Sequence, residues 1–287
     1  MKLQKAERRR AKIRLCLQGP SGSGKTYSSL LVAHGLCDDW SKIVVVDTEN
    51  HSADLYAHLG VYNTLSIEAP FTPERYLEAI LLCEKSGIEV IILDSVSHEW
   101  DGAGGILDIH GNMPGNSFAN WSKVTPRHNS FVQAILQSSC HIIATVRSKQ
   151  DYVLTDKNGK QVPEKVGMKG VQRDGLDYEF TLVFELDIKQ YASATKDRTS
   201  LFIDKTATKL SENEGRILLG WCNQGAGSST ETVDFSVAIR KAKGLEELKK
   251  LYRENLCYQI SHKGEFTARK KVLEAEQSEK LFNIFTH

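Results

Sequence analysis

The stretch Gly19-Pro20-Ser21-Gly22-Ser23-Gly24-Lys25-Thr26 decides the fold of this chain. It has the spacing G-x-x-x-x-G-K-T. Residues 13–18 before it (IRLCLQ) are an apolar run that predicts a buried strand, and residues 27–37 after it carry apolar side chains at helical spacing. A strand, a glycine-rich turn and a helix in this order predict a loop that cradles phosphate groups. A flexible glycine turn with the same letters is the alternative, and both flanks disfavour it.

Each residue type in this loop has a physical task in binding a nucleoside triphosphate. The glycines let successive backbone N–H groups point inward, and the N-terminus of the following helix adds partial positive charge. Lys25 is expected to reach the β- and γ-phosphates, and Thr26 to place its hydroxyl on Mg²⁺. The predicted ligands are therefore ATP and Mg²⁺. The predicted ATP-binding residues are Gly19, Pro20, Ser21, Gly22, Ser23, Gly24, Lys25, Thr26 and Tyr27.

Two further apolar runs end in acidic residues. Residues 43–47 (IVVVD) are followed two positions later by Glu49, and residues 90–94 (VIILD) end in Asp94. In a parallel sheet the carboxyl ends of the strands meet at one edge, where ligands bind. Asp94 is expected to hold the water shell of the magnesium ion and to bind the nucleotide through it. Thr26 and Asp94 are thus the predicted metal site.

The predicted catalytic base is Glu49. The residue after Asp94 is Ser95, whereas many ATPases carry their water-activating glutamate at that position. Either another side chain supplies the base, or the protein binds ATP without splitting it well. Glu49 should lie at the same sheet edge as the phosphate loop, which favours it. A surface glutamate is the alternative, and Glu99 is the next candidate if Glu49 proves inert.

The composition limits the classes of protein. The chain has 287 residues, a formal net charge of +1 and six cysteines. Its length allows one large α/β domain with an appendage. The charge confines any nucleic-acid binding to local patches. Cysteines without a C-x-x-C pair, and the absence of a long apolar run, predict a cytoplasmic protein with reduced thiols and no membrane partner.

The rest of the chain alternates predicted helices, strands and polar loops. Helices are expected over residues 73–86 and 121–137. Further strands are expected over residues 140–146, 178–188, 200–203 and 217–221. Long loops are expected between residues 99 and 121 and from 147 to 174. After a linker at 224–230, amphipathic helices are expected over 233–256 and 266–285, joined by a turn at 263–264.

Basic residues gather in three places. Residues 1–12 are expected to contact nucleic acid or a neighbouring subunit, or to form a solvated face. Lys196 and Arg198 stand two apart, so an extended strand presents both on one face; an exposed basic turn is the alternative. Basic side chains on the 147–174 loop suit contacts with a nucleic-acid backbone, the alternative being a solvated hairpin. The predicted DNA-binding residues there are Lys149, Lys157, Lys160, Lys165, Lys169 and Arg173.

Residues 10–222 resemble the core of the RecA-type recombinases, and more closely the phage-encoded RecA-like ATPases of single-strand annealing. The stretches that carry the resemblance are 19–26, 46–49, 91–95, 170–180 and 196–199. The resemblance implies an α/β fold: a RecA-like P-loop NTPase core, a mostly parallel twisted sheet with helices on both faces, plus a small C-terminal helical segment. The expected divisions are a basic segment (1–12), the ATPase core (13–224), a linker (225–232) and a C-terminal helical region (233–287).

The same resemblance implies roles for individual residues. Glu49 matches the glutamate that activates the attacking water, and Tyr56 lies near the spacing of a tyrosine that stacks on adenine. Thr145 lies where RecA carries a glutamine that senses the γ-phosphate. Lys196 and Arg198 match cations that enter the neighbouring subunit's site, which makes them catalytic together with Lys25. A homo-oligomer, ring or filament, is therefore implied.

The implied partner is single-stranded DNA, bound by loops near residues 101–120 and 148–172. The implied function is an Mg²⁺-dependent ATPase, stimulated by DNA, that supports homologous recombination or single-strand annealing. A single-strand-binding protein is a candidate partner for the C-terminal region. Two other functions share the phosphate loop: a nucleotide switch that recruits partners, and a P-loop kinase for a small molecule. A kinase needs a lid that carries arginines, whereas the long insertions here are rich in glycine and lysine.

Overall fold

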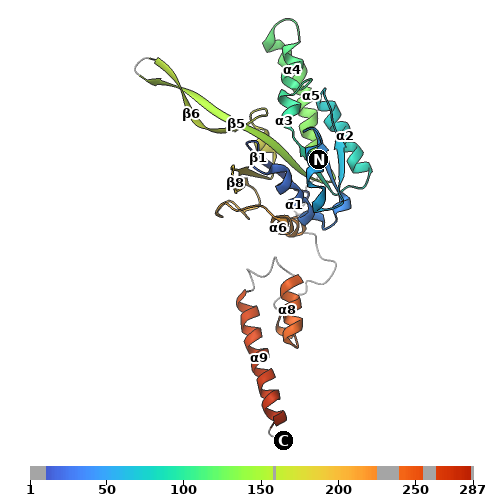
Figure 1. Cartoon of the computed structure of the whole chain (residues 1–287), viewed down its shortest axis with the longest axis vertical. Coiled ribbons are helices and arrows are strands. Elements are labelled where there is room, and N and C mark those ends of the chain that lie inside the picture. Colours follow the sequence, from blue (N-terminus) through green and yellow to red (C-terminus); the bar gives the residue numbers. More distant parts are fainter. Residues whose placement is uncertain (1–10, 158–159, 225–238, 255–262, 286–287) are drawn as a thin grey trace, which may run out of the picture. The chain divides into compact units, whose positions relative to one another are not determined.

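The computed structural model describes residues 11–157, 160–224, 239–254 and 263–285 (Figure 1). Ala11–Cys222 form one compact unit, and the C-terminal helices belong to a second. Of the basic segment at 1–12, residues 1–10 lie outside the described residues, as does the expected linker at 225–232. Within the described part of the chain, no helix has both the length and the apolar character needed to cross a membrane.

An eight-stranded sheet forms the centre of the first unit, in the order β3-β2-β4-β5-β1-β7-β8, with β6 paired to β5. Its strands are β1 (Arg14–Gly19), β2 (Ile43–Asp47), β3 (Asn63–Ser66), β4 (Val90–Asp94), β5 (His141–Lys157), β6 (Lys160–Gly170), β7 (Leu182–Leu186) and β8 (Ala192–Asp197). All pairs run parallel except β5–β6 and β7–β8. This mostly parallel sheet with flanking helices confirms the predicted α/β fold class.

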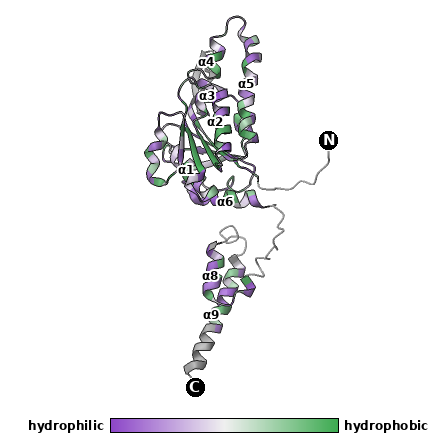
Figure 2. Ribbon diagram, turned by 90° about the vertical axis from the view of Figure 1, so that its right-hand side faces the viewer, coloured by the Kyte–Doolittle hydropathy of each residue, from purple (hydrophilic) through white to green (hydrophobic). Residues whose placement is uncertain are grey.

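Helices cover both faces of the sheet. On one face lie α1 (Lys25–Cys37) and α6 (Glu212–Asn223), and on the other α2 (Pro73–Lys85) and α5 (Ser117–Gln137). Side chains alternate along each strand, so Leu15 and Leu17 of β1 pack toward α1 while Cys16 packs toward α5. The central strands β2 and β4 are therefore apolar almost throughout, as Figure 2 shows, because both of their faces are buried, whereas β3 at the sheet edge is mostly exposed.

Helices α1 and α6 touch through their backbones. A Cβ atom added at Gly35 would lie 2.0 Å from the carbonyl oxygen of Glu212, and one added at Gly215 would lie 2.2 Å from that of Val32. Real Cβ atoms do not approach so closely, so each position requires glycine. This contact seats the phosphate-loop helix against the last helix of the unit.

Two of the predicted strands are wrong. Residues 217–221 lie in α6, which begins behind Ser211, whose N–H and hydroxyl donate to Glu214 Oε2 at 2.8 and 2.7 Å. A serine three residues before a glutamate signals a helix start, and that signal outweighs the apolar run. Residues 200–203 form a turn instead of a strand. The carboxylate of Asp197 accepts the backbone N–H of Phe202 at 2.7 Å and so bends the chain.

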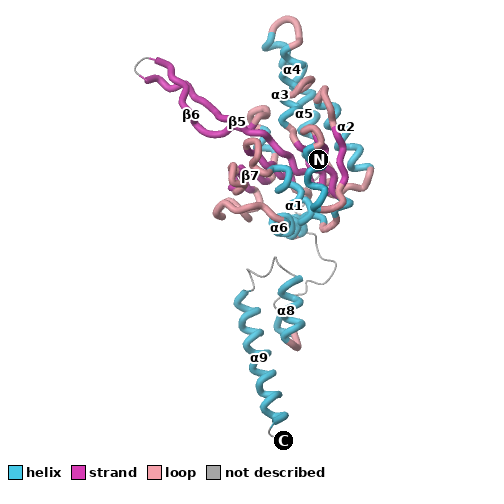
Figure 3. The backbone as a smooth tube through the Cα atoms, in the orientation of Figure 1, coloured by secondary structure: helices cyan, strands magenta, loops and turns pink. Residues whose placement is uncertain are grey.

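Both predicted long loops are regular structure. Residues 99–121 contain the end of α3 (Ser97–Asp101), α4 (Ile106–Gly111) and the start of α5, and positive-φ glycines at 104 and 115 mark the turns between them. Residues 148–157 and 160–170 are the paired strands of a β-hairpin, in which β5 leaves the sheet and pairs with β6 (Figure 3). Three short 3₁₀ helices complete the unit, η1 (Trp40–Lys42), η2 (Ser52–Leu59) and η3 (Leu176–Glu179).

The C-terminal unit contains α8 (Leu245–Glu254) and α9 (Lys263–Phe285), which share a small core of their own. The helix predicted over 233–256 is wrong in its extent, because residues 242–244 are not helical. The N–H of Lys243 donates to Glu247 Oε2 at 2.8 Å and caps a new helix there. The turn predicted at 263–264 is the first turn of α9.

Candidate nucleotide site

A cavity of about 1160 Å³ lies at the carboxyl ends of the central strands, above the upper range of ordinary ligand pockets. Its place follows from the parallel register, in which Gly19 of β1 pairs with Arg147 of β5, and Asp47 of β2 with Asp94 of β4. The predicted residues that line it are Ser21, Gly22, Gly24, Lys25, Thr26, Tyr27, Glu49, Tyr56 and Asp94. Four chain segments thus converge on one site.

The phosphate loop has the backbone that its glycines permit. Gly22 and Gly24 have φ angles of +81° and +79°, which L-residues rarely adopt. Lys25 Nζ donates to the carbonyl oxygens of Gly19 and Pro20, both at 2.9 Å. Burial lowers the pKa of Lys25, and the nearby carboxylates of Asp94 and Glu49 oppose this. The side chain of Lys25 is therefore held against the phosphate loop by these two hydrogen bonds.

The residues present fit a magnesium–triphosphate group. Ser23 Oγ and Ser148 Oγ are buried polar atoms without a hydrogen-bond partner in the described part of the chain. Ser148 lines the cavity, and Ser23 belongs to the phosphate loop. Thr26 Oγ1 donates to Asp94 Oδ2 at 2.6 Å, so a hydroxyl and a carboxylate already lie together. Hard oxygen ligands of this kind suit Mg²⁺. Thr26 and Asp94 would hold the ion, which neutralises phosphate charge when bound.

Asp94 is a buried carboxylate held by two threonines. Burial raises its pKa, and hydrogen bonds from Thr145 and Thr26 oppose the rise. Thr145 is fully buried, and its Oγ1 donates to Asp94 Oδ1 at 2.5 Å. Thr145 therefore lies behind the carboxylate of Asp94, and it is not among the side chains that line the cavity.

Glu49 has both carboxylate oxygens engaged. Oε1 accepts from Ser95 Oγ at 2.8 Å and from Arg147 Nε at 2.7 Å, and Oε2 accepts from Arg147 Nη2. Burial raises the pKa of Glu49, but the bonds from Arg147 and Ser95 together outweigh it and leave the pKa below its ordinary value. Glu49 is thus an ionised carboxylate beside the phosphate loop, and to take a proton from water it must exchange one of these bonds.

Arg147 is a site residue that the sequence did not reveal. It is the last residue of β5 in register with β1, and it lines the cavity. Its one signal is an arginine directly after a buried strand. The reserve candidate for the base, Glu99, is wrong: it is fully buried, and its carboxylate accepts from His128 Nδ1 at 3.1 Å, away from the cavity lining.

An aromatic pair and two further polar residues complete the lining. Tyr27 and Tyr56 have ring centroids 5.8 Å apart at 59°, and both face the cavity. Such a pair offers an apolar surface for a planar base. Gln190 and Lys209, neither of them predicted, also line the cavity. A Cβ atom at Gly24 would lie 3.3 Å from Gln190 Cγ, so this glutamine rests on the phosphate loop.

Lys196 and Arg198 lie at the amino ends of the parallel strands, whereas the nucleotide cavity lies at their carboxyl ends. Strand β8 runs antiparallel to β7, and its last residue, Asp197, pairs with Leu182 at the amino end of β7. Arg198 Nη2 donates to the carbonyl oxygen of Tyr178 at 2.8 Å, and Lys196 Nζ donates to the same oxygen. The two cations therefore lie side by side, away from the nucleotide cavity of their own chain.

The predicted DNA-binding residues are spread along the β5–β6 hairpin. Lys149, Lys169 and Arg173 lie at its base and line a second cavity of about 500 Å³. Lys169 Nζ lies 2.8 Å from Asp174 Oδ1. The backbones of Lys157, Lys160 and Lys165 belong to the hairpin strands, but their side chains lie outside the described residues.

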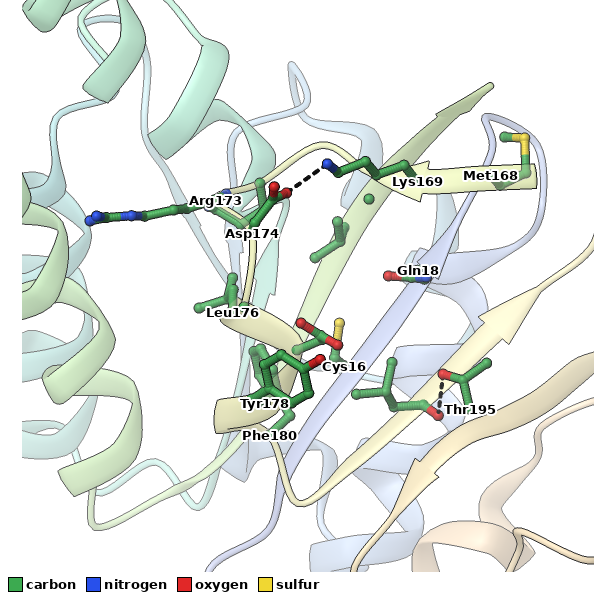
Figure 4. A pocket seen from close by; sticks show the side chains of 16 residues that line it. Cys16, Gln18, Met168, Lys169, Arg173, Asp174, Leu176, Tyr178, Phe180 and Thr195 are labelled. Carbon is green, nitrogen blue, oxygen red and sulfur yellow. Dashed lines mark hydrogen bonds and ion pairs between the residues drawn. The ribbon is translucent and has the colours of Figure 1, made fainter. Parts of the chain in front are cut away.

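A third cavity, of about 410 Å³, lies over β1 and β7 (Figure 4). Cys16, Phe180 and Val183 provide apolar lining for it. The picture shows Lys169 and Asp174 joined along its upper edge. Arg173 points away from this cavity, toward the helices on the other side of the loop. Arg173 is therefore directed at the helical side, where the second cavity lies.

Comparison with known protein families identifies the family of this chain. The family model described as AAA domain matches residues 11–215, which is more than half of the chain and includes the phosphate loop, Glu49, Asp94 and the hairpin. No curated protein matches the sequence. A phosphate loop beside the hydrogen-bonded pair of Thr26 and Asp94, where the strands of a parallel sheet end, agrees with this assignment. The chain therefore belongs to the AAA domain family, and its core is that of a P-loop ATPase.

Proposed function

We propose that this protein is an Mg²⁺-dependent ATPase that assembles as a homo-oligomer on single-stranded DNA, is stimulated by it, and supports recombination or single-strand annealing of the phage type. Membership of the AAA domain family supports ATP binding and hydrolysis. The DNA partner, the assembly and the recombination role are the proposal. A single-strand-binding protein remains a candidate partner of the C-terminal unit.

The proposed reaction divides its tasks among the residues of the cavity. The loop amides and Lys25 bind the phosphates, while Thr26 and Asp94 hold Mg²⁺. Glu49 accepts a proton from the attacking water, whose oxygen bonds to the γ-phosphorus as the bond to the leaving ADP oxygen breaks. Lys196 and Arg198 cannot serve their own site, because they lie at the amino ends of the parallel strands. In an oligomer they would stabilise the charge at a neighbour's γ-phosphate.

One observation carries the proposed stimulation by DNA, namely the ion pair of Glu49 with Arg147. Arg147 ends the part of β5 that pairs with β1, and the next residue, Ser148, pairs with Gly170 in the hairpin. A ligand that shifts the base of the hairpin therefore also shifts Arg147. That shift would release a carboxylate oxygen of Glu49 to accept a proton from water.

The nucleotide cavity and the second cavity at the hairpin base adjoin each other, so DNA bound in the second cavity would lie close to Glu49 and Arg147. Asp101 and Val171 line both the nucleotide cavity and the second cavity at the hairpin base. A strand bound along Lys149 and Arg173 would thus lie beside the site of hydrolysis. Cations at this place suit phosphate contacts whose strength falls with salt.

The test is the steady-state rate of ATP hydrolysis with and without an oligothymidylate. We expect single-stranded DNA to raise the rate of the wild-type protein. Lys25→Ala is the inactive control: it should bind ATP roughly 10- to 150-fold more weakly. It should show little hydrolysis with or without DNA, because it also loses the cation that stabilises the charge on the transferred phosphate. A wild-type rate that DNA leaves unchanged would contradict the proposal and favour a nucleotide switch.

A further inference from the structure

We propose that the second cavity is a stacking site for unpaired nucleobases, with the indole rings of Trp100 and Trp121 as its platform. This inference rests on the proposed binding of single-stranded DNA and assigns it a specific place. The cavity of about 500 Å³ has an apolar part formed by Trp100, Leu107 and Trp121, and a basic part formed by Lys149, Lys169 and Arg173.

Three aromatic rings, one from each of three helices, lie beside this cavity, each nearly parallel to the next. The ring of His110 on α4 stacks on Trp121 of α5, with centroids 4.1 Å apart and planes 22° apart. The ring of Trp121 is also nearly parallel to that of Trp100 of α3, at 22°, but their centroids lie 6.0 Å apart, so the two indoles overlap only in part and leave π surface open to the cavity. Trp100 and Trp121 are both only partly buried, and both line the cavity. Near-parallel indole faces at a cavity wall offer a π surface that any base can cover.

A buried carboxylate fixes this platform and its basic edge together. Glu99, the neighbour of Trp100, is fully buried and accepts from His128 Nδ1 at 3.1 Å and from Gln172 Nε2 at 3.2 Å. The ring of His128 also meets Trp100 edge-on, at 5.6 Å. Gln172 directly precedes Arg173 at the cavity. The stack therefore needs little reordering when a base binds, which favours affinity.

The charge and the shape favour a single strand over other ligands. Three cations line the cavity against two carboxylates, Asp101 and Asp174, and Lys169 pairs with Asp174. An anionic backbone along the basic part places its bases against the indoles. Bases of a duplex are already stacked on one another and have no free face for Trp121. Aromatic faces beside cations are the usual means of binding single strands without sequence preference.

The experiment compares two fluorescein-labelled strands of equal phosphate number, an oligothymidylate of ~20 nucleotides, longer than one site, and an abasic strand of the same length. Their affinities for the full-length protein are measured by anisotropy at several salt concentrations. We expect the wild-type protein to bind the thymidylate roughly 5- to 150-fold more tightly, the range found for aromatic stacking. The thymidylate alone should also quench the tryptophan fluorescence of the protein.

Variants separate the platform from the phosphate contacts. Trp121→Ala should remove most of the preference for thymidylate and leave the salt slope unchanged. Trp121→Phe keeps an aromatic ring and the packing, so it should retain much of the preference for thymidylate. Lys149→Ala should weaken both strands alike and flatten the salt slope. Trp40→Phe, in the core beside α1, is the control for losing an indole elsewhere.

Three outcomes overturn the inference. Equal affinity of the wild-type protein for both strands would remove the stacking site and leave DNA binding through phosphates intact. A thymidylate preference that survives Trp121→Ala with the fold intact would place the stacking elsewhere. Binding of neither strand would overturn the inference together with the proposed partner.

Discussion

Arg147 and Glu49 form a bidentate ion pair at the edge of the nucleotide cavity, with Nε donating to Oε1 at 2.7 Å and Nη2 donating to Oε2. The pair joins the hairpin base to the segment after β2. It also sets the state of the proposed base, because these bonds keep the pKa of Glu49 below its ordinary value despite burial. The Glu49–Arg147 ion pair therefore connects the proposed catalytic base directly to the base of the hairpin.

The first prediction concerns pH. In the wild-type protein the lowered pKa of Glu49 keeps the base ionised until the pH falls below the ordinary glutamate range. Arg147→Met removes the guanidinium and leaves burial, which raises the pKa, so ATP hydrolysis should decline at higher pH on the acid side of its profile. Superimposable pH–rate profiles would show that Arg147 does not act on the base. Arg127→Met, which breaks the pair of Arg127 with Glu74, is the control.

The second prediction tests Glu49 itself. Glu49→Gln keeps the size of the side chain and an oxygen to accept from Ser95 Oγ, but it loses the proton acceptor. ATP affinity should stay near that of the wild type, while turnover should fall by a factor on the order of 10²–10⁴. Glu74→Gln, at another arginine-paired glutamate outside the cavity lining, should change neither quantity. Unchanged turnover in Glu49→Gln would mean that another group activates water.

The third prediction tests catalysis across subunits. Arg198→Ala protein keeps the phosphate loop and Glu49, while Lys25→Ala protein keeps Lys196 and Arg198. If the two cations serve a neighbour's site, mixing these two inactive proteins should restore part of the ATP hydrolysis, because some interfaces regain a complete site. No recovery, with co-assembly shown by mass measurement, would count against this role. Full activity of Arg198→Ala alone would exclude it.

The fourth prediction concerns stability. Gly35→Ala should lower the free energy of unfolding by about 1–3 kcal/mol, the usual cost of overpacking, because the new methyl group would lie 2.0 Å from the carbonyl oxygen of Glu212. Gly111→Ala is the matched control, since nothing lies within 4 Å of its added Cβ. Chemical denaturation of both variants measures the difference. Equal stability would mean that α1 and α6 separate without cost.

The parts of the fold set by local signals were predictable. The apolar runs that end at Asp47 and Asp94 became buried parallel strands, because a strand covered on both faces must be apolar throughout. The phosphate loop was predictable for a similar reason, since its glycines, lysine and threonine act within eight positions. These signals predict that Lys25, Thr26, Glu49 and Asp94 lie at one sheet edge, as the structure shows.

The parts of the fold and of the site that depend on long-range contacts were not predictable from the sequence. Arg147 meets Glu49 across 98 positions, and Trp100 meets Trp121 from a different helix, so neither pairing leaves a periodic pattern. The hairpin was predicted only as the alternative to a long loop, because β5 continues beyond the sheet, where no covering helix demands an apolar run. The wrong strand at 217–221 could have been predicted as a helix from a local signal, the helix-capping pair of Ser211 and Glu214.

The measurement that tests the central claim most directly is the factor by which single-stranded DNA raises ATP hydrolysis, in the wild-type protein and in Arg147→Met. The account predicts a clear stimulation of the wild-type protein. In Arg147→Met, whose Glu49 is already released, it predicts a factor near one at a pH where the base is ionised. Arg127→Met should behave like the wild type. Equal stimulation of wild type and Arg147→Met, or none in either, would contradict the account.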